Sequence, residues 1–144
     1  MIEQDTVKLL RECDAGVKMG VSAINEVLDY VKDEKLKKIL IEGLDENDRI
    51  EKELRKPLAE YHDDGKEPNP MAKSMAWIKT NVKLTMDESD NVIADLITDG
   101  CNMGIKSLRK YLNQYQAADE DSKNLAKRLI KHEEKLAAAM AEYL

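Results

Sequence analysis

Four polar residues, Asp14, Glu46, Asp99 and His132, lie at or beside positions where the helical spacing calls for an apolar side chain. Asp14 and His132 continue their apolar stripes directly, Glu46 adjoins the inward-facing position of Asn47, and Asp99 borders its stripe. Each lies roughly 14 to 19 residues from the turn of its hairpin, so antiparallel packing is expected to bring all four within a helical turn or two of one level. The sequence therefore predicts a polar layer near mid-bundle.

A buried carboxylate is costly unless it is paired, hydrogen-bonded or bound to a metal. Carboxylate and imidazole suit iron, manganese or zinc, and helical bundles assemble such ligands from several helices. Asp14, Asp99 and His132, with Glu46 if it turns inward, would form a site for one Fe, Mn or Zn ion. In the alternative, no cofactor is expected: His132 bonds to one aspartate, Asn47 bonds to the other or to water, and the layer fixes the register.

Apolar residues at three- and four-residue intervals predict the elements that must position these side chains. The spacing predicts long helices over 6–31, 33–61, 92–115 and 120–143, and a short amphipathic helix over 71–82. No strand pattern competes with them. The sequence thus predicts an all-α fold, one domain over residues 1–144, in which two helical hairpins form a four-helix bundle and the short helix belongs to a crossover.

Local signals refine the expected helix ends. Asp33 and the segment 119–122 supply capping residues, and breakers mark 62–70 as the main loop. Pro57 predicts a kink or an early end in the second helix, because proline lacks the amide hydrogen and its ring crowds the preceding turn. His132 is expected to be the only inward-facing residue of 132–135, a stretch otherwise interpreted as a solvated charge run.

A shift of 85 residues aligns Asp14 with Asp99 and Tyr30 with Tyr115, and it aligns the two predicted turns as well. This agreement favours an internal duplication. With the first hairpin repeated, a lengthwise crossover would place the third long helix parallel to the second.

Composition narrows the function classes. The net charge of -6 disfavours a nucleic-acid partner, because phosphate binding requires clustered lysine and arginine. The residues after Met1 have neither the basic start nor the apolar run of a secretion signal, and no later run is long enough to cross a membrane. The expected location is the cytoplasm, where Cys13 and Cys101 would remain free thiols.

Two hairpins, a long crossover and inward acids at mid-height resemble the ferritin-like superfamily. More closely, the segments 31–37, Glu46-Asn47-Asp48-Arg49 and Glu53-Leu54 resemble small bacterial ferritin-like proteins of unknown function. The resemblance implies a ferritin-like bundle with an extra short crossover helix.

The chain departs from the two-iron pattern of that superfamily, which uses a lone Glu on each of two helices and Glu-x-x-His on the others. Leu129 stands three residues before His132, and Arg49 stands where a histidine would follow Glu46. Asp14 and Asp99 are the only counterparts of the lone glutamates. An intact two-iron site is therefore not expected.

These observations lead to two functional hypotheses. In the first, the protein is non-enzymatic and acts through protein association, as a homodimer that uses the apolar face of Met71, Met75, Trp77 and Ile78. The alternative for this face is that it simply covers the bundle. In the second, it binds a metal through Asp14, Glu46, Asp99 and His132. For that hypothesis, the superfamily resemblance implies a stress-linked role in handling iron or oxidants.

Overall fold

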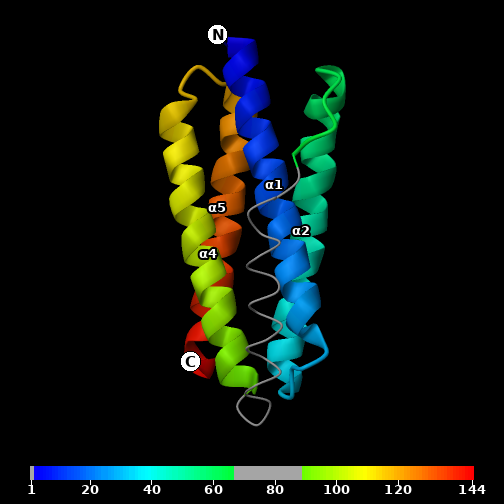
Figure 1. The fold of residues 1–144 in the computed structure, drawn as a ribbon, viewed down its shortest axis with the longest axis vertical. Helices are drawn as coiled ribbons and strands as arrows, with labels where there is room; N and C mark the ends of the chain where they lie inside the picture. The colour runs from blue at the N-terminus through cyan, green and yellow to red at the C-terminus, as the bar shows by residue number, and fades with distance from the viewer. Residues whose placement is uncertain (1, 67–88) are drawn as a thin grey trace.

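A computed structural model describes residues 2–66 and 89–144, and that part of the chain is all-helical (Figure 1). The helices are α1 (Ile2–Leu28), α2 (Glu34–Glu60), α4 (Ser89–Gln114) and α5 (Glu120–Met140), followed by a 3-10 turn, Ala141–Tyr143. No helix in these two ranges is long and apolar enough to cross a membrane. The expected helix over 71–82, with its Met71, Met75, Trp77 and Ile78 face, lies outside the described residues.

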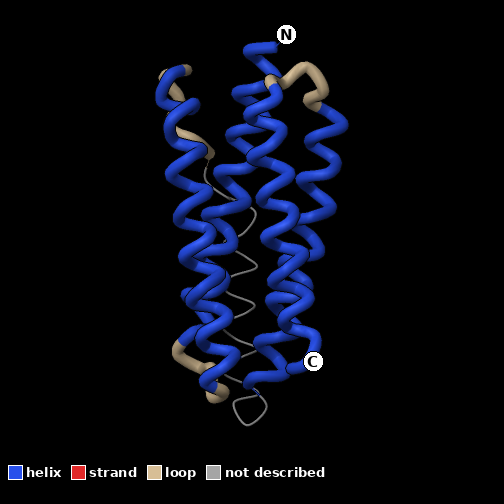
Figure 2. Tube along the Cα trace, turned by 180° about the vertical axis from the view of Figure 1, so that it is seen from behind, coloured by secondary structure: helices blue, strands red, loops and turns tan. Residues whose placement is uncertain are grey.

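The four helices form two antiparallel hairpins, α1–α2 and α4–α5, whose long axes run side by side (Figures 1 and 2). α4 starts at the end of the bundle where α2 starts, so these two helices run parallel, as the sequence predicted. α1 and α5 also contact each other across the diagonal of the bundle. The prediction of an all-helical bundle is therefore confirmed for the described residues.

Capping residues begin two of the helices where the sequence predicted. The Asp33 carboxylate accepts a hydrogen bond from the Leu36 amide at 2.9 Å, and the Asp119 carboxylate accepts one from the Ser122 amide at 2.8 Å. Of the two outcomes predicted at Pro57, a kink or an early end, the early end is wrong, since α2 continues to Glu60. The fixed φ of proline is compatible with a helix. Its missing amide hydrogen removes only one of the many backbone hydrogen bonds of this long helix.

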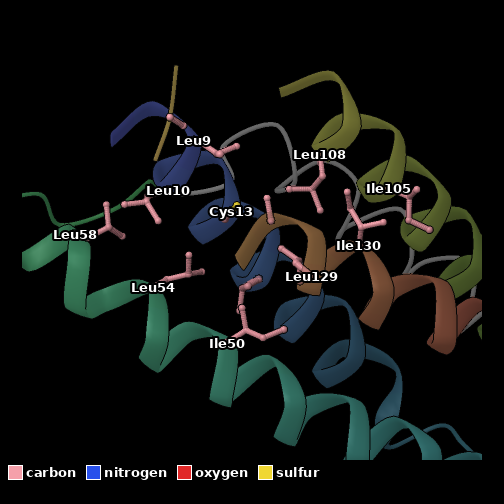
Figure 3. Close-up of a cluster of buried hydrophobic side chains, with 13 residues drawn as sticks. Leu9, Leu10, Cys13, Ile50, Leu54, Leu58, Ile105, Leu108, Leu129 and Ile130 are labelled. Atoms are coloured by element: carbon pink, nitrogen blue, oxygen red, sulfur yellow. The ribbon is translucent and has the colours of Figure 1, made fainter. Parts of the chain in front are cut away.

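Two apolar clusters fill the interior. The first contains the ten side chains labelled in Figure 3: Leu9, Leu10, Cys13, Ile50, Leu54, Leu58, Ile105, Leu108, Leu129 and Ile130. The second lies towards the other end, around Ile24, Leu36, Leu40, Ile93 and Met140. Each fully buried leucine or isoleucine contributes about 1.5–3 kcal/mol of hydrophobic stabilisation. The residues between the clusters include several polar side chains and glycines.

The two hairpins repeat each other, with a register that differs from the predicted uniform shift. Buried positions of α1 recur 84 residues later in α4, as in the pairs Leu9/Ile93, Leu10/Ala94, Cys13/Ile97 and Val17/Cys101. Buried positions of α2 recur 86 residues later in α5, as in the pairs Leu36/Ser122, Leu40/Ala126, Ile50/Leu136 and Leu54/Met140. The counterpart of Asp14 is therefore Thr98, and not Asp99.

Each hairpin also binds the turn of the other. The Asp90 carboxylate, in the first turn of α4, accepts hydrogen bonds from the Lys32 and Asp33 amides at 2.9 and 3.0 Å. In the first turn of α1, Asp5 accepts one from the Ala117 amide at 3.0 Å, and the Thr6 hydroxyl accepts one from the Asp119 amide at 2.8 Å. We refer to these two sets of hydrogen bonds as the end clasps.

Candidate functional site: a polar layer and the α2–α5 groove

The structure distributes the four predicted site residues over three places. Asp14 is buried, Glu46 and His132 share a groove between α2 and α5, and Asp99 is exposed on α4. The expectation that Asp99 borders the core is wrong. It lies two residues, roughly 200° of helical rotation, from the buried Cys101, so its side chain points to the opposite side of α4.

Asp14 is held by protein groups on several sides. Its Oδ2 accepts a hydrogen bond from the Lys66 amide at 2.9 Å and pairs with Lys18 Nζ, also at 2.9 Å. Gly65 lies directly against this carboxylate: a Cβ there would stand 2.1 Å from Oδ2, and the backbone has a φ of +91° that glycine tolerates best. The chain leaving α2 therefore covers Asp14.

Glu51 on α2 is a second acid at this position. Burial, followed by the neighbouring Asp14, raises the pKa of Glu51, although Arg55 donates to its Oε1 at 3.1 Å and opposes the shift. Its Oε2 is buried and has no hydrogen-bond partner in the described structure. Asp14 thus has the partners that a buried carboxylate requires, and they are protein groups.

Glu46 and His132 lie together, as the sequence expected, but in the α2–α5 groove. Arg128 Nη2 donates to Glu46 Oε1 at 2.8 Å, and Arg128 also pairs with Glu53. The hydrogen bond from Arg128 lowers the pKa of Glu46. Burial lowers the pKa of the half-buried His132, whose Nε2 has no hydrogen-bond partner among the described residues. The predicted bond from His132 to an aspartate is not formed in the described structure.

The acid that faces the interior from α5 is Glu133, which the sequence analysis placed in a solvated charge run. Its Oε2 is buried and has no partner in the described structure, and burial raises the pKa of this carboxyl to about 8. The interval between Leu129 and Leu136 fits either 132 or 133 as its inward position. The small buried residues Ser122 and Ala126 are in phase with 133, and counting them in the stripe would have identified Glu133.

The layer between the two apolar clusters contains a repeated glycine–polar pair. A Cβ at Gly20 of α1 would lie 3.1 Å from Asn47 Nδ2 on α2, and a Cβ at Gly104 of α4 would lie 2.5 Å from Glu133 Oε1 on α5. Gly20 and Gly104 are 84 residues apart, and Asn47 and Glu133 are 86 apart. Both pairs therefore occupy equivalent positions, and each glycine leaves room for the polar side chain facing it.

Cys13 and Cys101 are both free and buried. Burial, the largest cause, and the nearby Glu133 contribute to raising the pKa of each thiol to about 12. A thiol with so high a pKa is protonated at neutral pH, which leaves little of the reactive thiolate.

The α2–α5 groove has a volume of about 540 Å³ and two walls of opposite charge. Its floor is formed by the apolar or small residues Ile39, Gly43, Leu136 and Ala139. α2 contributes Glu42, Asp45 and Glu46, with Arg49 paired to Glu46 at 3.5 Å. α5 contributes Arg128, Lys131, His132 and Lys135. We refer to Glu42, Asp45 and Glu46 as the acidic wall, and to Arg128, Lys131, His132 and Lys135 as the basic wall.

Within residues 2–66 and 89–144, no group of three or more His, Cys, Asp or Glu side chains is arranged to hold a metal ion. Of the four predicted ligands, only Glu46 and His132 are neighbours, and Arg128 already pairs with Glu46. Comparisons of the chain with protein-family models, with curated proteins and with solved structures find no match.

Proposed function

We propose that the protein is a non-enzymatic helical bundle that acts through association, and that the α2–α5 groove is its contact face in a homodimer. The observation that carries this proposal is the charge arrangement of the groove. Glu42 and Asp45 are exposed on one wall, and Lys131 and Lys135 are exposed on the other. Arg128 joins the two walls through Glu46, so the acids and bases lie at the same height along the bundle.

A two-fold axis parallel to the helices makes this surface self-complementary. Such an axis places α2 of one copy over α5 of the other without changing height, so each acidic wall faces a basic wall. The same residues then meet twice, as in other isologous dimers. A two-fold axis perpendicular to the helices would instead place acid over acid and is disfavoured.

Sedimentation equilibrium at low and high salt tests the proposal. The wild type should be dimeric in about 50 mM salt and should dissociate as the salt rises, because salt screens exposed charge pairs. Reversing the acidic wall (Glu42→Lys with Asp45→Lys) should give a monomer, and so should reversing the basic wall (Lys131→Glu with Lys135→Glu). Mixing the two reversed proteins should restore a dimer. Both walls of the first variant are then basic and both walls of the second variant are acidic, so the two variants attract each other.

The matched control reverses exposed charges on α4, Asp95→Lys with Lys106→Glu, which lie away from the groove and should leave the mass unchanged. A wild type that is monomeric at every concentration, or a dimer indifferent to both wall reversals, would rule out the proposed interface.

Binding of a single Fe, Mn or Zn ion is the alternative proposal. It is supported by His132, whose buried Nε2 lacks a partner in the described structure, and by the neighbouring Glu46. It ranks second because Arg128 already binds Glu46 and, with Lys131 and Lys135, repels a cation.

A further inference from the structure

Gly104 and Glu133 form a contact in the α4–α5 hairpin that differs chemically from its counterpart in the first hairpin. The Gly20–Asn47 pair encloses a neutral amide, whereas the Gly104–Glu133 pair encloses a carboxyl group. An amide is uncharged at every physiological pH, but a carboxyl group is uncharged only while it holds a proton. The two equivalent positions therefore differ in their response to pH.

The surroundings of Glu133 favour the protonated form. Among residues 2–66 and 89–144, the ionisable groups on which the Glu133 charge acts include Cys13 on α1 and Cys101 on α4, and both are buried thiols. Neither supplies a positive charge, and Oε2 accepts no hydrogen bond from any described residue. Because a buried carboxylate without a cation or donors is costly, the closed hairpin favours the neutral acid.

We propose that Glu133 and Gly104 form a proton-operated latch, in which the α4–α5 hairpin packs tightly while Glu133 is protonated and loosens when Glu133 releases its proton to solvent. Ionisation leaves a carboxylate against the α4 backbone, where Gly104 has no side chain to hold it away. Hydration of that carboxylate requires water between α4 and α5. The latch does not depend on dimerisation through the groove.

The direction of the pH effect follows from the sign of the shift. Burial raises the pKa of Glu133 to about 8, above the ordinary value of 4.5. The stabilisation given by the protonated acid is therefore complete below pH 4.5 and is lost as the pH rises through 8.

Thermal unfolding between pH 6 and 9.5 tests the latch in the wild type and in Glu133→Gln, which keeps the shape and removes the titration. The melting temperature of the wild type should fall by about 3–8 °C across this range relative to that of Glu133→Gln. The control is Glu134→Gln, a change at the exposed neighbouring residue, which should follow the wild type. Equal pH slopes in the wild type and Glu133→Gln would overturn the proposal.

A second measurement covers the case in which Glu133→Gln folds poorly. Carbon-13 NMR of the glutamate side-chain carboxyls in the wild type should show one resonance titrating near pH 8, and amide exchange in α4 and α5 should quicken over the same range. Titration of every glutamate carboxyl below pH 6 would also overturn the latch.

Discussion

His132 lines the α2–α5 groove, with Gly43 and Glu46 on the facing helix. Glu133, the next residue, is also half-buried, but its carboxyl lies against Gly104 of α4, with Oε2 buried. Successive residues of a helix point about 100° apart, so His132 faces the groove while Glu133 faces α4.

Acidification should destabilise the protein partly through His132. Burial lowers the pKa of His132 below 6.5, so the stabilisation it gives as a neutral ring is present above pH 6.5 and is lost as the pH falls through the lowered value. His132→Leu should match or exceed the wild-type stability at pH 7 and should reduce the loss of unfolding free energy between pH 7 and 5.

Urea denaturation at each pH measures this effect. The control is His62→Asn, because His62 is exposed and has a φ of 57°, which asparagine tolerates. If His132→Leu loses as much unfolding free energy between pH 7 and 5 as the wild type does, His132 does not contribute to the acid destabilisation.

At the scale of the helices, much of the architecture could be predicted from the sequence. Apolar spacing identified four long helices, and the Asp33 and Asp119 caps fixed two of their starts. The site was less predictable because it depends on which face of each helix is buried. A stripe of large apolar residues defines that face only to within one or two positions, so Asp99 was assigned to the core and Glu133 to solvent.

Two glycines of α4 should respond differently to alanine. A Cβ at Gly100 meets nothing within 4 Å in the described structure, so Gly100→Ala should gain about 0.5–1 kcal/mol from helix propensity alone. A Cβ at Gly104 would meet both carboxylate oxygens of Glu133, so Gly104→Ala should gain less than Gly100→Ala, because the Glu133 side chain must shift to admit it.

A double-mutant cycle separates the causes. Adding Glu133→Ala to Gly104→Ala should recover stability relative to the sum of the two single changes, because the crowding then disappears. Additive effects, or equal gains at Gly100 and Gly104, would show that Glu133 does not limit the approach of α4 and α5.

The whole molecule is held together at its ends by the clasps as well as by its core. Asp90 on α4 receives two amide hydrogen bonds from the turn between α1 and α2. Asp90→Ala should therefore cost about 1–2 kcal/mol of unfolding free energy. It should also speed amide exchange at Lys32 and Asp33.

The appropriate control is Asp95→Ala, a change at an exposed residue of the same helix one and a half turns further on. It should leave exchange in the α1–α2 turn unchanged. Wild-type exchange at Lys32 and Asp33 in the Asp90 variant would show that this clasp does not hold the turn in solution.

The end clasps are reciprocal: the start of each hairpin binds the turn of the other. The chain thus has the organisation of a two-subunit assembly whose subunits share one polypeptide. For separate hairpins, these bonds would form only at concentrations that favour association. The covalent connection replaces that dependence with a fixed effective concentration. Each hairpin then serves as the permanently bound ligand that completes the turn of its neighbour.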